Sequence, residues 1–229
     1  LRKQTFQDFE TIVVDNGSQD GSVSFLQQRY PEVMIIALSL NHGFAQANNV
    51  GIRHAKGELI FLLNNDAAPA PSCLETLVKV MNAHSEIGSC ATRMVLSKRP
   101  DTLDSAGDGF SVCGTAFKRG HLEPADNYSD DTWVFGACGG AAVYRRKMLE
   151  DVGLLDEKYF IIHEDSDLNF RAQMMNYSCR YVANAVVTHH CNATLSPYSS
   201  AYVFFSQRNV ERLFFKNVPG TLLWRMLPR

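Results

Sequence analysis

Short apolar runs alternate with helix-like segments along the first third of the chain. Strands are predicted at residues 10–15, 33–38 and 59–63, each closed by turn residues. Helices are predicted at residues 23–28, 45–55 and 72–82. Ser72 and Glu75 have the spacing of a capping box at the start of the third helix. Because the strands lack clean alternation, this order predicts an α/β fold with a mostly parallel, twisted sheet flanked by helices.

The second half of the chain has a less regular pattern. Strands are predicted at residues 90–96, 141–144 and 180–187. Helices are predicted at residues 146–152, 164–176 and 202–215. Residues 101–131 are polar and contain glycine, without a clear element. Since no repeat or linker interrupts the chain, we expect a single domain over residues 1–229.

Composition indicates an ordinary globular protein, because 229 residues with 45% hydrophobic content can bury a substantial core. The formal net charge of -2 argues against nucleic acid as the main partner. Six cysteines lie far apart without a C-x-x-C pair: Cys73, Cys90, Cys113, Cys138, Cys179 and Cys191. This spacing disfavours a zinc ribbon or a disulfide scaffold and predicts reduced, partly buried thiols in a cytoplasmic protein.

Polar side chains follow the predicted strands at the edge where parallel sheets bind ligands. Asp15 ends the first strand, and Asn64 and Asp66 end the third. A carboxylate at Asp15 can accept a hydrogen bond from the N3–H of a pyrimidine base. The oxygens of Asn64 and Asp66 suit a hard divalent cation such as Mg²⁺. Both motifs are also ordinary turn chemistry, which leaves a structural alternative open for each.

An acidic cluster and a histidine supply further candidates. Glu164, Asp165 and Asp167 place three acids within four positions at the start of a predicted helix. Such crowding favours a site that needs a proton acceptor or a cation, although acids also complement a helix dipole. His189 follows a predicted strand, so a helix and a strand can return it to the edge that carries Asp165. Its imidazole is a ligand for Mn²⁺ or a similar ion.

Two other features allow both a functional and a structural interpretation. Gly139 and Gly140 lie in a run of small residues, which permits the approach of a ligand or close packing. Arg208, Arg212 and Lys216 share one helical face, which is either solvated or turned towards the site, where Arg208 would neutralise a diphosphate. The absence of P-loop and Gly-x-Gly-x-x-Gly motifs argues against P-loop nucleotidases and Rossmann dehydrogenases.

Together these motifs resemble those of the inverting glycosyltransferases of family 2, and within them the rhamnosyltransferase-like group. The matching segments are residues 13–22, 41–51, 62–66, 152–160, 164–171, His189 to Thr194 and Arg208 to Asn209. They follow the family order and cover nearly the whole chain. The resemblance implies a GT-A fold and a metal-dependent enzyme that transfers a sugar from a nucleotide-diphosphate donor, dTDP-rhamnose or a UDP-sugar. The implied acceptor is a glycan or a lipid-linked glycan in cell-surface polysaccharide synthesis.

The resemblance also implies a role for each candidate residue. Asp165 would be the general base that deprotonates the acceptor hydroxyl. Asp66 and His189 would hold Mg²⁺ or Mn²⁺ on the diphosphate. Asp15 would recognise uracil or thymine, whereas Asp167 would be a first-turn acid that stabilises its helix. The other residues implied in nucleotide or donor binding are Asn41, Phe44, Asn48, Asn64, Gly139, Gly140, Glu164 and Arg208.

The chain departs from the family pattern in two respects. Asn64 stands in the first position of the family's Asp-x-Asp motif, which leaves one carboxylate and predicts weaker metal affinity. The family's first strand would precede Leu1, so we expect a chain truncated at the N-terminus, and at the C-terminus too, that is unstable or inactive alone.

Two alternative functions stay open at this stage. A sugar-nucleotide nucleotidyltransferase would need a basic, glycine-rich phosphate loop near the first strand. A non-catalytic nucleotide- or glycan-binding module would not need Asp165 beside Asp66 and His189. For the glycosyltransferase, we expect a cytoplasmic location with peripheral association at the inner face of the cell membrane, and no nucleic-acid partner.

Overall fold

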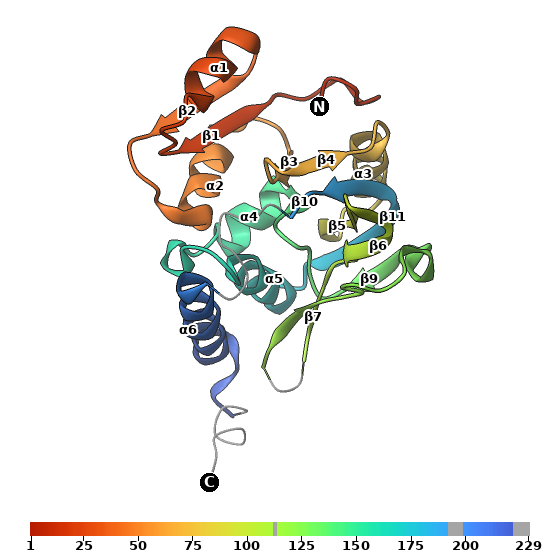
Figure 1. Ribbon diagram of the computed structural model, residues 1–229. Coiled ribbons are helices and arrows are strands. Elements are labelled where there is room, and N and C mark those ends of the chain that lie inside the picture. Colours follow the sequence, from red (N-terminus) through yellow and green to blue (C-terminus); the bar gives the residue numbers. More distant parts are fainter. Residues whose placement is uncertain (112–113, 192–198, 222–229) are drawn as a thin grey trace.

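The computed structural model describes residues 1–111, 114–191 and 199–221. Cys113 and Thr194 therefore lie outside the described residues. A twisted sheet forms the centre, with helices packed around it (Figure 1). This confirms the predicted α/β class.

The central sheet is mixed in strand direction. Along it lie β3 (Leu59–Leu63), β10 (Ala141–Arg145), β5 (Ile87–Leu96), β11 (Ser178–His189) and β4 (Ala67–Pro69). β5 and β11 are parallel, whereas β10 runs antiparallel to β3 and β5. The reason is the path of the chain, which leaves β5 at the carboxyl edge of the sheet and re-enters through β10 from that same edge. β10 thus begins beside the end of β3, with Ala141 opposite Leu63.

The excursion between β5 and β10 adds four strands and a short helix. They are β6 (Arg99–Ser105), β7 (Asp108–Phe110), β8 (Ala116–Lys118), the 3-10 helix η1 (Ala125–Tyr128) and β9 (Thr132–Val134). β6 pairs with β5 and β9 pairs with β11, while β7 and β8 form a hairpin of their own. The polar stretch at residues 101–131 therefore contains ordered structure that the sequence pattern did not predict.

The first two strands form a separate parallel sheet. It consists of β1 (Ile12–Asn16) and β2 (Met34–Leu38), connected through helix α1 (Ser22–Arg29). Helix α2 (Gly43–His54) packs on β1, where Gly51 lies so close to Val14 that an added Cβ would sit 3.2 Å from a valine methyl. All four elements match the predicted order of strand and helix.

Helices cover both faces of the central sheet because successive strand residues point to opposite sides. On one face, Ala142 and Tyr144 pack with residues of α2, α4 (Arg146–Val152) and α5 (Glu164–Met174). On the other face, Ala141 and Val143 pack with residues of α3 (Cys73–Ala83). The described cysteines are free, and Cys73, Cys90 and Cys179 are buried in these layers. Among the described residues, no helix combines the length and apolar character needed to cross a membrane.

The predicted capping box at α3 is wrong. Ser72 is the N-cap residue, but its side chain makes no capping hydrogen bond. Glu75 instead accepts a hydrogen bond from Oγ1 of Thr5 at 2.7 Å and pairs with Lys79. Because the N-terminal segment lies against this helix start, it offers Glu75 a partner that competes with the local cap.

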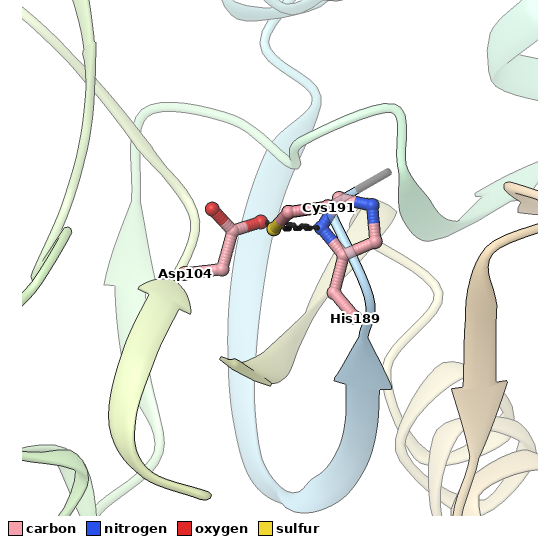
Figure 2. A group of neighbouring side chains, drawn as sticks. All are labelled: Asp104, His189 and Cys191. Atoms are coloured by element: carbon pink, nitrogen blue, oxygen red, sulfur yellow. Dashed lines mark hydrogen bonds and ion pairs between the residues drawn. The ribbon is translucent and has the colours of Figure 1, made fainter. Parts of the chain in front are cut away.

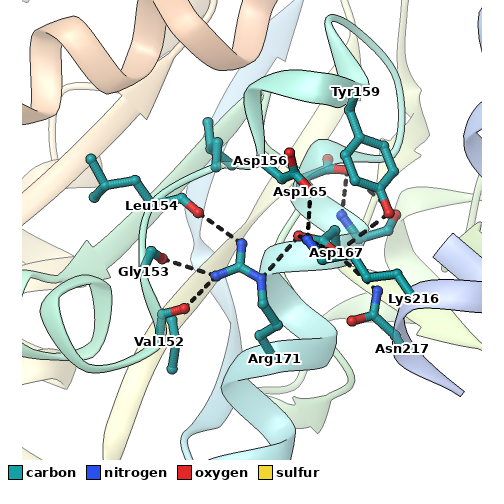
Figure 3. Close-up of polar contacts among 12 residues, drawn as sticks. Val152, Gly153, Leu154, Asp156, Tyr159, Asp165, Asp167, Arg171, Lys216 and Asn217 are labelled. Atoms are coloured by element: carbon teal, nitrogen blue, oxygen red, sulfur yellow. Dashed lines mark hydrogen bonds and ion pairs between the residues drawn. The ribbon is translucent and has the colours of Figure 1, made fainter. Parts of the chain in front are cut away.

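Asp167 is more than a first-turn acid, because its carboxylate is fully buried between two helices. It accepts hydrogen bonds from Arg171 of α5 and from Lys216 and Asn217 of α6 (Ser200–Asn217), each at 2.9 Å (Figure 3). Lys216 also pairs with Asp156, just before the 3-10 helix η2 (Glu157–Tyr159). A buried carboxylate needs such partners. Asp167 therefore lies in the first turn of α5, as predicted, and also anchors α6 to α5.

Candidate functional site

Asp15 lies at the carboxyl end of β1, as predicted, and is 9% exposed. One of its carboxylate oxygens, Oδ2, accepts a hydrogen bond from the backbone N–H of Ser18 at 3.0 Å. The other oxygen accepts no hydrogen bond from the part of the chain that the structure describes. Asp15 is therefore both a turn residue and a carboxylate with acceptor capacity for a ligand.

Asn41 and Asn48, which were predicted to contact the nucleotide, make hydrogen bonds within the protein that hold the loop before α2 and the start of that helix. Oδ1 of Asn41 accepts hydrogen bonds from Nδ2 of Asn16 and from the backbone N–H of Gly43, both at 2.9 Å. Nδ2 of Asn48 donates to the carbonyl of Phe44 in the same helix at 2.9 Å. These bonds fix the position of the Phe44 backbone, and direct contact of either asparagine with a nucleotide stays a prediction.

Asp165, Gly139 and Phe44 meet at one point. The backbone N–H of Gly139 donates to Oδ2 of Asp165 at 2.9 Å, and the N–H of Ser166 donates to Oδ1 at 2.7 Å. A Cβ on Gly139 would lie 3.3 Å from Cβ of Asp165 and 3.6 Å from the Phe44 ring. Two predicted site residues from separate parts of the chain, Gly139 and Phe44, thus lie beside the candidate base.

Gly140 connects this point to the end of β3. Its carbonyl accepts a hydrogen bond from the backbone N–H of Asn64 at 2.9 Å, and a Cβ on Gly140 would lie 3.4 Å from the Asn64 side chain. Asn64 begins the short turn that carries Asp66 to the start of β4. The glycine pair therefore lies between the acidic start of α5 and the Asn64 to Asp66 motif.

His189 contacts two carboxylates, one through each ring nitrogen. Nε2 lies 3.1 Å from Oδ1 of Asp66, and Nδ1 lies 2.8 Å from Oδ2 of Asp104. Figure 2 shows Asp104, His189 and Cys191 gathered at the end of β11, with the cysteine sulfur 3.3 Å from Nδ1. The predicted pair of Asp66 and His189 is thus in contact. Asp104 was not predicted, because it lies in the stretch where no strand was recognised.

The charges around Asp104 hold its carboxylate ionised. Burial raises the pKa of Asp104, but hydrogen bonds from His189 and Lys118 outweigh that effect and hold the pKa well below its usual range. Nζ of Lys118 lies 2.9 and 3.1 Å from the two carboxylate oxygens. The hydrogen bond to Asp104 in turn raises the pKa of His189. Asp104 therefore fixes the orientation of the ring, with Nε2 turned to Asp66.

The donor set suits a divalent cation. Asp66 offers a carboxylate oxygen and His189 offers Nε2, while Asp104 occupies the other ring nitrogen, as a carboxylate commonly does behind a metal-binding histidine. Asp104, His189 and Cys191 also have ligand atoms within 4.8 Å of one another. The ammonium of Lys118, which pairs with Asp104, would repel a cation bound next to Asp104. The geometry therefore favours a cation site next to Asp66.

A second group of acids lies beside the candidate base. Asp108 and Lys118 are opposite each other in the β7–β8 hairpin, and burial together with the charge of Asp165 raises the pKa of Asp108 well above its usual value. Glu164 is 5% exposed, and burial followed by the charge of Asp165 raises its pKa to about 8. Oε2 of Glu164 has no hydrogen-bond partner among the described residues. At neutral pH Glu164 is thus an uncharged acid next to Asp165.

Arg208 lies on α6 and points to the backbone before α5. Its Nη2 donates to the carbonyls of Lys158 at 3.1 Å and Tyr159 at 2.8 Å. The helical face that it shares with Arg212 and Lys216 is turned towards the protein, since both other cations lie over the Tyr159 ring. This face is therefore only partly solvated, with Lys216 still exposed, and binding of a diphosphate by Arg208 stays a prediction.

Solved structures with the same fold include glycosyltransferases bound to nucleotides. GalNAc-T7 with UDP, GalNAc and Mn²⁺ matches with a TM-score of 0.68 at 15% identity, over 89% of this chain and 41% of that one. The mannosyltransferase PcManGT from Pyrobaculum calidifontis with GDP-Man and Mn²⁺ matches with a TM-score of 0.59 at 19% identity, over 94% and 56%. This likeness confirms the GT-A fold, whereas the chain spans only about half the length of these solved chains.

Sequence relatives point to the same group. The chain is 26% identical to an N-acetylglucosaminyl-diphospho-decaprenol L-rhamnosyltransferase of Mycobacterium tuberculosis, over 91% of this chain and 78% of that protein. It is also 26% identical to the O-antigen biosynthesis protein RfbC of Myxococcus xanthus, over 85% of this chain and 16% of that protein. The model of glycosyl transferase family 2 matches residues 1–153, which is more than half of the sequence. The chain is therefore a member of glycosyl transferase family 2.

Proposed function

We propose that this protein is an inverting glycosyltransferase that moves a sugar from a nucleotide-diphosphate donor to a glycan or lipid-linked acceptor. The observation that carries the proposal is the Asp165 carboxylate, which accepts a hydrogen bond from Gly139. The next residue, Gly140, contacts Asn64 at the start of the turn that carries Asp66. The donor we favour is dTDP-rhamnose or a UDP-sugar. Relatives named as a rhamnosyltransferase acting on a decaprenol-linked sugar and as an O-antigen biosynthesis protein support a role in cell-surface polysaccharide synthesis.

Asp165 would act as the general base. It accepts the proton of the acceptor hydroxyl while that oxygen forms a bond to the anomeric carbon of the donor sugar. The bond from that carbon to the nucleotide diphosphate breaks on the opposite face, and its electron pair leaves with the diphosphate. One displacement inverts the anomeric configuration and needs no covalent intermediate. Hydrogen bonds from Gly139 and Ser166 aim the carboxylate, and the neutral form of Glu164 places no second charge beside it.

Donor binding would use the polar edge of the sheet. Asp15 accepts a hydrogen bond from N3–H of uracil or thymine. Asp66 and His189 would hold Mg²⁺ or Mn²⁺, which neutralises charge on the diphosphate when bound. We assign the remaining nucleotide and sugar contacts to Asn41, Phe44, Asn48, Asn64, Gly139, Gly140, Glu164 and Arg208.

Nucleotide binding and turnover of the full-length protein test this proposal. Thermal shifts with Mn²⁺ or Mg²⁺ should be larger for UDP or dTDP than for GDP, and Asp15→Asn should remove that preference. Asp165→Asn should abolish transfer from dTDP-rhamnose or a UDP-sugar while nucleotide affinity stays within about twofold. A preference for GDP would contradict the role of Asp15. Near-normal turnover by Asp165→Asn would exclude Asp165 as the base.

The acceptor also determines where the protein would work. A lipid-linked acceptor lies at the membrane surface, so we propose a cytoplasmic protein that associates peripherally with the inner face of the membrane. Sedimentation with vesicles that contain a polyprenyl-diphosphate sugar should recover more protein than sedimentation with plain phospholipid vesicles. Equal recovery would argue for a soluble glycan acceptor.

A further inference from the structure

The backbone between η2 and α5 adopts a strained conformation. Phe160 has φ 67° and ψ −64°, and the N–H of Ile161 donates to the carbonyl of Tyr159 at 2.8 Å. These values define the rare form of γ-turn, which carries steric strain. Ile162 and His163 also have positive φ angles, of 72° and 70°, a region that β-branched and bulky residues avoid. The strain immediately precedes the first turn of α5, where Asp165 lies.

Asn209 of α6 binds the carbonyls on both sides of this turn. Its side chain is fully buried, and Nδ2 lies 3.0 Å from the carbonyl oxygen of Tyr159, 2.8 Å from that of Ile161 and 2.6 Å from that of Ile162. Arg208 donates to Oδ1 of Asn209 at 3.0 and 2.9 Å. These two bonds fix the orientation of the Asn209 side-chain amide, so that its N–H groups point at the turn.

Phe160 is held from two further sides. Its carbonyl accepts a hydrogen bond from the N–H of Ala45 in the first turn of α2 at 3.3 Å. Its ring stacks on Phe205 of α6, with ring centres 5.1 Å apart and an interplanar angle of 13°. At Gly43 an added Cβ would lie 2.5 Å from the Phe160 carbonyl oxygen. The turn is therefore clamped between α6 and the same turn of α2 that carries Phe44 to the candidate base.

We propose that Asn209 is a positioning residue for Asp165. The strained segment persists because its carbonyls bind the Asn209 amide, and its direction sets where α5 begins. Without the amide, residues 159–163 relax to ordinary backbone angles and the first turn of α5 shifts away from Gly139. This inference rests on the proposed function, in which Asp165 is the base. In this proposal, helix α6 helps to position the carboxylate of Asp165, although the two lie far apart in the sequence.

The test compares two asparagines of α6 in the full-length protein. Asn209→Ala removes the amide from the turn. Asn217→Ala is the matched control, because Asn217 donates from the same helix to Asp167 of α5 at 2.9 Å and makes no hydrogen bond to the described residues 159–163. For Asn209→Ala we expect kcat with dTDP-rhamnose or a UDP-sugar to fall at least tenfold. KM for that donor and the Kd of UDP or dTDP with Mn²⁺ should stay within twofold, and Asn217→Ala should keep kcat within twofold.

Three outcomes would overturn the proposal. They are an unchanged kcat in Asn209→Ala, an equal loss in both variants, and a loss of nucleotide affinity as large as the loss of kcat. If Asn209→Ala does not fold, Asn209→Asp keeps the side-chain volume and the contacts to Arg208 while removing both amide donors. The same tenfold fall in kcat is then expected, and a normal kcat would again overturn the proposal.

Hydrogen exchange separates this proposal from the proposed function. The amide of Ile161, which closes the turn, should exchange at least tenfold faster in Asn209→Ala than in Asn217→Ala. Equal exchange rates would show that Asn209 does not hold the turn. A different result would separate the two proposals: Asp165→Asn could retain full activity while the Ile161 amide still exchanges faster in Asn209→Ala. Asp165 would then not be the base, but Asn209 would still hold the turn.

Discussion

The backbone N–H of Gly139 donates a hydrogen bond to Oδ2 of Asp165 over 2.9 Å. This bond connects the loop before β10 to the first turn of α5, and it leaves little room for a side chain at Gly139. The conformation of Gly139 is ordinary, so its glycine is required by the proximity of Asp165 rather than by a positive φ.

Gly139→Ala should therefore lower activity without unfolding the protein. The new Cβ would lie 3.3 Å from Cβ and 3.4 Å from Oδ2 of Asp165, so the carboxylate must move by a few tenths of an ångström. We expect kcat to fall about tenfold, since small displacements of a catalytic group are costly. Gly220→Ala is the control, because its added Cβ would have no atom of the described residues within 4 Å, apart from its own chain neighbours. Equal kinetics of the two variants would show that the space at Gly139 is not needed.

Asp104→Asn should weaken metal binding. The carboxylate fixes the His189 ring through Nδ1, and loss of such a partner lowers metal affinity by about 10–100-fold. The measurement is the Kd of Mn²⁺ by electron paramagnetic resonance, in the absence of any donor. Asp101→Asn changes an exposed acid on the same strand and serves as the control. An unchanged Kd in Asp104→Asn would place the cation away from His189.

Glu164→Gln should change how stability depends on pH. Folding raises the pKa of Glu164 from 4.5 to about 8, so the folded state holds a proton that the unfolded state releases between these values. Stability therefore falls as pH rises through this window, by roughly 1.4 kcal/mol per unit at most. The glutamine variant lacks this loss, and its advantage in unfolding free energy should grow from pH 5 to pH 8. Glu211→Gln, on the exposed side of α6, should behave like the unchanged protein.

Asp167→Ala should destabilise the fold strongly. It would leave Lys216 and Arg171 without their buried partner, which we expect to lower the free energy of unfolding by about 3 kcal/mol. Urea denaturation measures this loss. Asp126→Ala is the control, because it removes a fully exposed carboxylate that pairs with Arg93. The denaturation midpoint of this variant should stay unchanged. Similar midpoints for both variants would mean that α6 does not depend on Asp167.

Many strands and helices were predicted well, because hydrophobic periodicity and turn residues depend on near neighbours in the sequence. β3 and α4 begin and end where the apolar pattern and turn residues placed them. The contact between Asp66 and His189 agrees with the resemblance to family 2, which implied that these two residues share a metal ion. Asp104 and Lys118 were missed because β6 is polar and β8 has only three residues. Both strands are ordered by pairing with other strands rather than by a periodic pattern.

Tertiary contacts also changed the meaning of residues that the sequence had singled out. Glu75 binds Thr5 instead of capping α3, and Asp167 anchors α6 instead of simply facing a helix dipole.

By itself, the sequence determined the order of strands and helices and the chemical character of the site, because periodicity and turn propensity act between near neighbours. Only the tertiary structure decided the direction of β10, the contact of His189 with Asp104 and the strained turn before Asp165. Each of these depends on which distant segments supply hydrogen bonds, as Asn209 does for the turn. A buried polar group must form hydrogen bonds with whichever groups lie next to it in the folded protein. Those partners are distant in the sequence, so local patterns do not predict them.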